Sequence, residues 1–90
     1  MRKIWKFPAP FPNGNIVMPK GAKVLTLQMQ DGVPTLWAEV DPDAPDEIHH
    51  LVTYGTGHPV DPGAGSYIGT YQSPPFVWHV YDASGSPQAR

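Results

Sequence analysis

The sequence predicts an all-β fold: a single small antiparallel β-sandwich or partly open barrel of six to seven short strands. Twelve prolines and nine glycines interrupt the chain so often that its longest segment free of both, residues 22–31, is ten residues long. The segments between these breakers are rich in Val, Ile, Trp, Tyr and Phe, which favour strands. A helical bundle needs longer uninterrupted segments and is therefore excluded.

The first strand expected along the chain is Lys3–Phe7, whose side chains alternate in character. The proline-rich segment 8–14 is predicted to leave the sheet in an extended conformation and to end in an Asn-Gly turn. A second short strand, Asn15–Met18, stops at Pro19, and residues 20–21 form a turn.

The clearest element is a hairpin in the middle of the chain. The apolar residues that alternate along its first strand are expected to face the core: Leu25, Leu27 and Met29. Asp31-Gly32 is typical of a type I′ turn. The return strand, Val33–Val40, presents its own apolar face, formed by Leu36, Ala38 and Val40. Trp37 is therefore expected on the opposite face.

The second half of the chain also consists of short predicted strands separated by loops rich in proline and glycine. A proline-stiffened acidic loop, residues 41–47, precedes a strand at Ile48–Tyr54. A glycine-rich loop, Gly55–Gly65, leads to two final strands, Tyr67–Tyr71 and Phe76–Tyr81. The whole therefore reads as antiparallel strands joined by turns and loops.

Ninety residues make one domain, which we expect to span residues 1–82, followed by a flexible C-terminal tail, residues 83–90. The chain has no cysteine, so neither a disulfide nor a thiolate metal site can compensate for a small core. Stability must come from dense aromatic packing, from stiffening by proline, or from a partner subunit. Dimerisation of two identical chains through a sheet edge is one open alternative.

The charges are unevenly distributed along the chain. Five cations precede the first acidic residue, Asp31, and the only later cation is Arg90. The net charge of −2 argues against strong binding of duplex nucleic acid, which requires a clearly basic domain. No apolar run approaches the ~20 residues of a membrane span, and prolines follow the charged N-terminus where a signal peptide has its apolar region. A cytoplasmic protein is expected, with no membrane partner.

Four histidines raise the question of a metal site. His49 and His50 are adjacent on a strand and point to opposite faces, so they cannot share one ion without a bulge. A cluster of His50, His58 and His79 would need folding to assemble it, and the spacings are not those of metal ligands. We therefore predict no metal site and no cofactor, and keep histidine-based metal binding as an alternative.

The sequence also predicts no catalytic residue and no enzyme. It has no G-x-S-x-G motif for a serine nucleophile, and its carboxylates gather in the exposed loop 41–47. The glycine-rich loops lack the lysine of a phosphate-binding loop and the following helix. A chain of this length could hardly form a large catalytic cleft and keep a core.

The aromatic residues are the remaining functional signal, because large rings act as second-layer core or as anchors of an interface. The predicted partner-binding residues are Trp37, Tyr67, Tyr71, Trp78 and His58. A protein partner, either another protein or a second copy of the chain, is favoured because few cations lie near these rings. A binder of single-stranded nucleic acid or nucleotides is the alternative, with Trp37, Tyr67 and Trp78 stacking on bases beside Lys3, Lys6 and Lys23.

Five segments of the chain resemble one family of proteins: Ile16–Leu25, Val33–Ala38, Tyr54–Pro59, Tyr67–Thr70 and Phe76–Val80. The family consists of short uncharacterised proteins of phage, prophage and bacterial genomes, and the likeness extends from about Ile4 to Tyr81. It brings no assigned activity, cofactor or catalytic residue. It implies a context in which small phage-encoded proteins bind a host factor. The leading hypothesis is therefore a non-enzymatic protein that works by protein–protein contact, as a phage-encoded modulator of a host protein.

Overall fold

A computed structural model describes residues 1–84 as an all-β domain of seven strands, as the sequence predicts. The strands are β1 (Lys3–Pro8), β2 (Asn13–Pro19), β3 (Lys23–Gln30), β4 (Val33–Val40), β5 (Asp46–Gly55), β6 (Ser66–Ser73) and β7 (Phe76–Asp82). Residues 85–90, most of the expected tail, lie outside the described residues. Within residues 1–84 no helix is long and apolar enough to cross a membrane.

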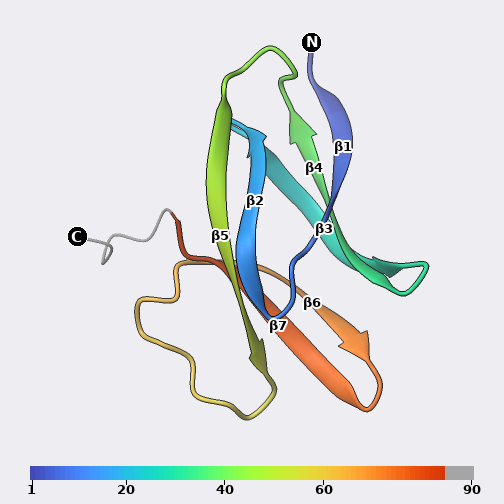
Figure 1. Cartoon of the computed structure of the whole chain (residues 1–90), viewed down its shortest axis with the longest axis vertical. Helices are drawn as coiled ribbons and strands as arrows, with labels where there is room; N and C mark the ends of the chain where they lie inside the picture. Colours follow the sequence, from blue (N-terminus) through green and yellow to red (C-terminus); the bar gives the residue numbers. More distant parts are fainter. Residues whose placement is uncertain (85–90) are drawn as a thin grey trace.

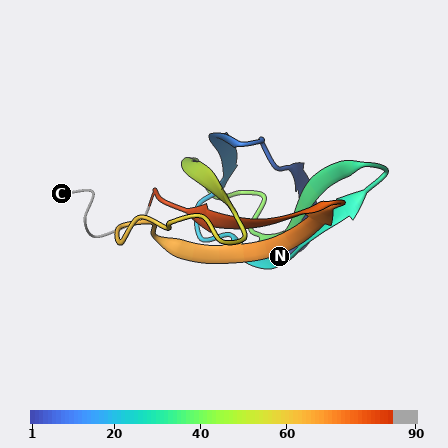
Figure 2. The ribbon, with the colours of Figure 1, turned by 90° about the horizontal axis from the view of Figure 1, so that it is seen from below.

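The strands form two antiparallel sheets, as Figure 1 shows. The three-stranded sheet has the order β1-β4-β3, and the four-stranded sheet has the order β2-β5-β7-β6. The sheets do not close into a barrel. They form a small β-sandwich whose extent along its shortest axis is 17 Å (Figure 2). They come closest where β3 passes β6, because a Cβ at Gly69 would lie 3.0 Å from the Cβ of Leu27.

The core lies between the sheets and is built from the predicted face of β4. Leu36, Ala38 and Val40 are fully buried there, and they pack with residues of the other sheet such as Leu51 and Val80. The further buried members of this cluster are Ala9, Ile16, Met18, Leu27 and Tyr71. Trp37 lies on the opposite face of β4, half-buried, as its place in the alternation predicts.

The predicted apolar face of β3 is wrong in part. A β-bulge at Leu25 shifts the register, so that Val24 pairs with Ala38 and the next pair is Thr26 with Trp37. Leu25 is 46% exposed, whereas Leu27 is buried. Met29 stays on the face of Leu27, because it pairs with Pro34 as Leu27 pairs with Leu36, and it is 37% exposed near the end of the strand. A bulge adds one residue to a strand and so interrupts the strict alternation from which the face was predicted.

Two of the three predicted glycine turns of the first half differ in outcome. Asp31 and Gly32 have φ angles of 51° and 80°, the left-handed pair that a type I′ hairpin turn requires. The expected turn at Asn13-Gly14 is wrong, because both residues pair with β5 in the first positions of β2. Gly14 is needed for close packing: a Cβ there would lie 2.7 Å from the Cβ of Pro10.

The remaining connections stay near their predicted positions. The acidic loop is shorter than expected because β5 begins at Asp46, and the side chain of Asp41 accepts a hydrogen bond from the Asp43 amide. After β7, the amide of Ala83 donates to the carbonyl of His50. The peptide bonds before Pro12 and Pro75 are cis.

Candidate functional site

Three aromatic rings gather at one end of the sandwich. The ring of Trp78, in β7, contacts Phe11 at a centroid distance of 5.0 Å and Phe76 at 5.4 Å. Phe11 comes from the proline-rich crossing between the sheets, and Phe76 begins β7. Phe11 is 54% exposed and Phe76 is 57% exposed, while Trp78 is half-buried against the core. We call Phe11, His58, Phe76 and Trp78 the aromatic patch.

A cavity of about 450 Å³ opens beside Phe76 and Trp78. Its other walls are Gly55, Thr56, His58, Pro75 and Val77. A tight turn brings His58 to this wall, since its amide donates to the carbonyl of Gly55 and Gly57 has a φ of 87°. His58 is therefore positioned by its own backbone, next to the indole of Trp78.

A second cavity, of about 210 Å³, lies beside Phe11 and Trp78. Its further lining residues are Met29, Gly32, Pro34, Tyr71 and Ser73. Because both cavities share Trp78, they form one apolar surface that spans the β6–β7 hairpin and the end of the β3–β4 hairpin. Within the described part of the chain, none of the residues lining the two cavities carries a formal charge.

The predicted partner-binding residues fall into three places. His58 and Trp78 lie together in the aromatic patch, and Tyr71 pairs with Trp78 across β6 and β7. Tyr71 is buried at the floor of the second cavity, where burial raises the pKa of its hydroxyl. Tyr67 lies on the outer face of the four-stranded sheet, and Trp37 on the outer face of the other sheet.

Sequence reasoning missed Phe11 and Phe76, the two most exposed rings of the patch. Both adjoin proline: Phe11 stands between Pro10 and Pro12, and Phe76 follows Pro74-Pro75. Phe11 lies in the proline-rich connection between β1 and β2, and Phe76 is the first residue of β7, so neither ring lies in the middle of a strand. Their position next to proline was the sequence feature that could have identified them.

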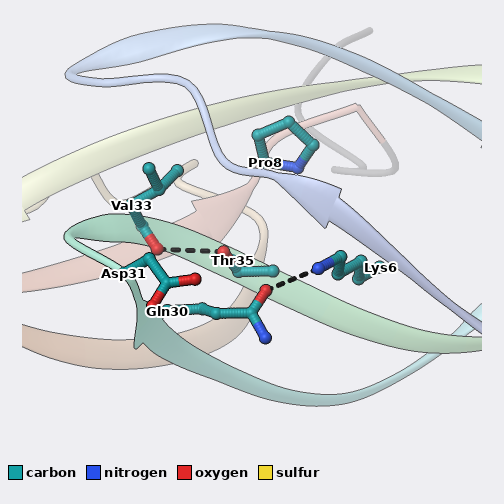
Figure 3. A pocket seen from close by; sticks show the side chains of 6 residues that line it. All are labelled: Lys6, Pro8, Gln30, Asp31, Val33 and Thr35. Atoms are coloured by element: carbon teal, nitrogen blue, oxygen red, sulfur yellow. Dashed lines mark hydrogen bonds between the residues drawn. The ribbon is translucent and has the colours of Figure 1, made fainter.

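A third cavity, of about 300 Å³, lies on the outer face of the three-stranded sheet (Figure 3). Its walls are Lys6, Pro8, Gln30, Asp31, Val33 and Thr35. Lys6 donates a 2.7 Å hydrogen bond to Oε1 of Gln30, and the buried hydroxyl of Thr35 donates to the carbonyl of Val33. Lys6 also pairs with Trp37 across β1 and β4.

The residues of the nucleic-acid alternative do not all converge. Lys6 and Lys23 share the outer face with Trp37, because Lys23 pairs with Glu39 of β4. Lys3 pairs with Val40 and so lies on the other face, while Tyr67 and Trp78 belong to the four-stranded sheet. Only one of the three proposed stacking rings therefore lies beside cations of this set.

The histidines lie apart from one another. His50 and His79 are on the outer face of the four-stranded sheet, where Nδ1 of His50 bonds Asn15 and the ring of His79 bonds two threonines. His49 faces the opposite way, as its place on the strand predicts. Among residues 1–84, no group of three or more His, Asp or Glu side chains could hold a metal ion.

His49 is part of a polar cluster at the rim of the core. Its Nδ1 lies 2.7 Å from Oδ2 of Asp82, and its Nε2 lies 3.1 Å from Glu47 Oε1 but outside hydrogen-bond geometry. Burial alone would raise the pKa of the Asp82 carboxyl. Hydrogen bonds from the hydroxyl and amide of Ser84, together with His49, outweigh burial and lower that pKa. The cluster ties the end of β7 to β5.

Comparison with known proteins identifies the family and nothing further. Searches of curated proteins and of solved structures each found no match. A family model described as "Domain of unknown function (DUF7352)" matches residues 1–90. The chain therefore belongs to the DUF7352 family.

Proposed function

We propose that this domain is a non-enzymatic binding module that contacts another protein through the aromatic patch. The observation that carries the proposal is the exposure of Phe11 and Phe76, each more than half accessible, around the indole of Trp78. Exposure of a large aromatic ring to water is unfavourable, and each ring can bury on the order of 150–250 Å² when a partner covers it. Aromatic residues of this kind are the usual anchors of protein interfaces.

The lining of the two cavities supports a protein partner of apolar character. Charged residues are depleted at the centre of protein interfaces, and the described lining residues carry no formal charge. Aromatic-walled grooves accept apolar side chains and proline-rich segments, because a preformed extended segment loses little entropy on docking. A partner segment with exposed prolines or large apolar residues fits this surface.

Affinity capture with matched baits tests the proposal. The baits are the wild-type protein, Phe76→Ser in the patch and Ile4→Ser in β1, two residues of similar exposure at 57% and 61%. We expect wild-type and Ile4→Ser baits to retain a stoichiometric protein from bacterial lysate, and Phe76→Ser to retain at least about fivefold less of it. Equal capture by all three baits would contradict the proposal, as would no stoichiometric capture from several hosts.

The resemblance to phage and prophage proteins supports a biological setting for the same proposal. In that setting the domain is phage-encoded, acts in the cytoplasm of its bacterial host and modulates a host protein. Chemical cross-linking during expression in a bacterial host tests it, with Phe76→Ser as the comparison. If cross-links formed only with proteins whose genes neighbour the gene of this domain, a host target would be contradicted.

One observation favours a second candidate, the binding of single-stranded nucleic acid. Trp37 lies beside Lys6 on an outer sheet face, a ring next to a cation as in stacking platforms. Titration with a single-stranded oligonucleotide tests it. Quenching of tryptophan fluorescence that weakens with salt, and that is lost in Trp37→Ala but kept in Trp5→Ala, supports this function. Unchanged fluorescence in the wild-type protein rejects it.

A further inference from the structure

The outer face of the four-stranded sheet is a surface with its own character. It is the side opposite Leu51 and Val80, which point into the core. Its central residues, assigned by strand register, are Asn13, Asn15, Val17, Ile48, His50, Val52, Tyr54, Tyr67, Thr70, Gln72, Val77, His79 and Tyr81. We call this set the outer face. None of its residues lines the aromatic patch except Val77, which borders the larger cavity.

Three of the apolar and aromatic side chains on this face are exposed, and the others are half-buried. Ile48 is 64% accessible, its cross-strand neighbour Val17 is 49%, and Tyr67 is 57%. Three tyrosines form a row of edge-to-face contacts, with Tyr81 at centroid distances of 5.6 Å from Tyr54 and 5.5 Å from Tyr67. Tyrosine is enriched at protein interfaces because its ring buries apolar area and its hydroxyl tolerates water.

The outer face is also almost free of charge. Of the described positions in these four strands that share this side, Asp46 alone carries a formal charge, at the margin where β5 begins. The acidic loop, the lysines of β1 and β3, and Asp82 lie elsewhere in the fold. An uncharged face is suited to meeting an identical face, since a two-fold contact would otherwise bring like charges together.

Several polar side chains of the outer face already have hydrogen-bond partners within the domain. Nδ1 of His50 lies 2.8 Å from Oδ1 of Asn15, and Oδ1 of Asn13 accepts from the Thr53 amide. The ring of His79 lies between two threonines, with Nδ1 2.9 Å from Thr70 and Nε2 2.7 Å from Thr56.

These bonds form one chain. Tyr67 contacts the Thr70 hydroxyl, Thr70 and Thr56 each share a hydrogen bond with one ring nitrogen of His79, and Thr56 donates to the Val77 carbonyl. Every one of these groups keeps its partner when water is removed. Covering this part of the face therefore leaves these groups hydrogen-bonded, which avoids the main penalty of burying them.

We propose that the outer face of the four-stranded sheet is an interface with a second copy of this chain. Four strands about 4.8 Å apart and about eight residues long, at ~3.3 Å per residue, cover roughly 500 Å² on each copy. Two copies then bury about 1,000 Å², the lower limit for a specific interface. The dimer is therefore weak, with a dissociation constant on the order of micromolar.

A second copy fits this face better than a ligand that reads it through hydrogen bonds. A sugar or a nucleotide base would need free donors and acceptors, whereas Nδ1 of His50 and both ring nitrogens of His79 are engaged within the domain. Pairing at a sheet edge, which the sequence alone suggests, would use a different surface. The edge strands β1 and β3 carry lysines that oppose such pairing, whereas the edge strands β2 and β6 carry no formal charge. The inference does not depend on the aromatic patch or on its partner.

Sedimentation equilibrium over a range of concentrations up to about 500 µM tests the proposal, because a micromolar dimer populates both species in that range. Two matched pairs of variants locate the contact. Ile48→Glu on the outer face is compared with Ile4→Glu on β1, at 64% and 61% exposure. Tyr67→Glu on the outer face is compared with Phe76→Glu in the patch, both at 57%.

Each outer-face substitution enters a two-fold interface twice, so we expect Ile48→Glu and Tyr67→Glu to weaken dimerisation about tenfold or more. Ile4→Glu and Phe76→Glu should leave it unchanged. Circular dichroism of each variant confirms that it is folded, and Ile48, as the most exposed of the four, is the least prone to disturb the fold. A wild-type monomer at every concentration would overturn the proposal, as would a dimer weakened only by Ile4→Glu or by Phe76→Glu.

Discussion

The imidazole of His58 lies in the space that a side chain at Gly55 would need. A Cβ at residue 55 would lie 2.8 Å from Nδ1 of His58 and 3.2 Å from Cζ3 of Trp78. The backbone of Gly55 is outside the left-handed region, so the requirement for glycine comes from the neighbouring rings. This contact sets the shape of the larger cavity at the aromatic patch.

Gly55→Ala should therefore destabilise the domain by about 1–3 kcal/mol, because the added methyl group must push the two rings away. Chemical denaturation followed by tryptophan fluorescence measures the loss, and the emission of Trp78 should shift as its surroundings change. The double variant Gly55→Ala/His58→Ala is the control, since it removes the nearer obstructing ring. If the double variant is no more stable than Gly55→Ala, the contact with His58 is not the cause.

The bulge in β3 separates two leucines that alternation treats as equivalent. Leu27→Ala should cost about 2–5 kcal/mol, because Leu27 is buried against the core and Gly69. Leu25→Ala should change stability by no more than about 0.5 kcal/mol, because Leu25 is the exposed bulge residue. Denaturant titration of both variants checks the difference, and losses of equal size would show that the strand has no bulge at Leu25.

Replacing threonine by valine should have opposite effects on stability at two positions, because only one of the two hydroxyls is hydrogen-bonded within the described part of the chain. Oγ1 of Thr53 is buried and has no hydrogen-bond partner within residues 1–84, so Thr53→Val should be neutral or stabilise by up to about 1 kcal/mol. The buried hydroxyl of Thr35 donates to the carbonyl of Val33, so Thr35→Val should destabilise by about 1 kcal/mol. Thermal unfolding of the two variants compares them directly. A Thr53→Val protein less stable than Thr35→Val would contradict the assignment.

The polar cluster of Asp82 predicts an acid dependence. The folded pKa of Asp82 lies below its ordinary value, so the carboxylate stabilises the fold above the unfolded pKa, and this contribution is lost as pH falls through the folded pKa. Asp82→Asn should therefore cost about 1–2 kcal/mol at neutral pH. Its stability should converge with that of the wild type as the pH falls below about 4. Urea denaturation at a series of pH values measures the gap, and a gap independent of pH would refute the role of the charge.

The strands and the hairpin turn were predictable because their signals are local. The alternation of apolar and polar residues predicted β4 and its core face, and Asp31-Gly32 predicted the left-handed turn. The same reasoning failed at Leu25 and at Asn13-Gly14. A bulge depends on how one strand meets its partner, and Gly14 serves a close contact with Pro10, which residue type alone does not reveal.

The candidate site was predictable only in part. Trp78 and His58 were identified as aromatic or polar residues in a β-rich chain, but their meeting with Phe11 and Phe76 was not. Tyr71, Tyr67 and Trp37 have similar sequence surroundings, yet one is buried and the other two lie on different outer faces. The irregularity between Tyr67 and Gly69 in the register of β6 and β7 places the two tyrosines on opposite faces, and Trp37 belongs to the other sheet.

From its amino acids alone, this chain is committed to short strands, tight turns and a core without disulfides, because backbone preference and side-chain alternation act over a few residues. The order of the strands, the gathering of rings around Trp78 and the uncharged outer face come from contacts between segments far apart in the chain. Those contacts depend on packing and pairing between whole sheets. The spacing of residues along one strand therefore does not predict these contacts.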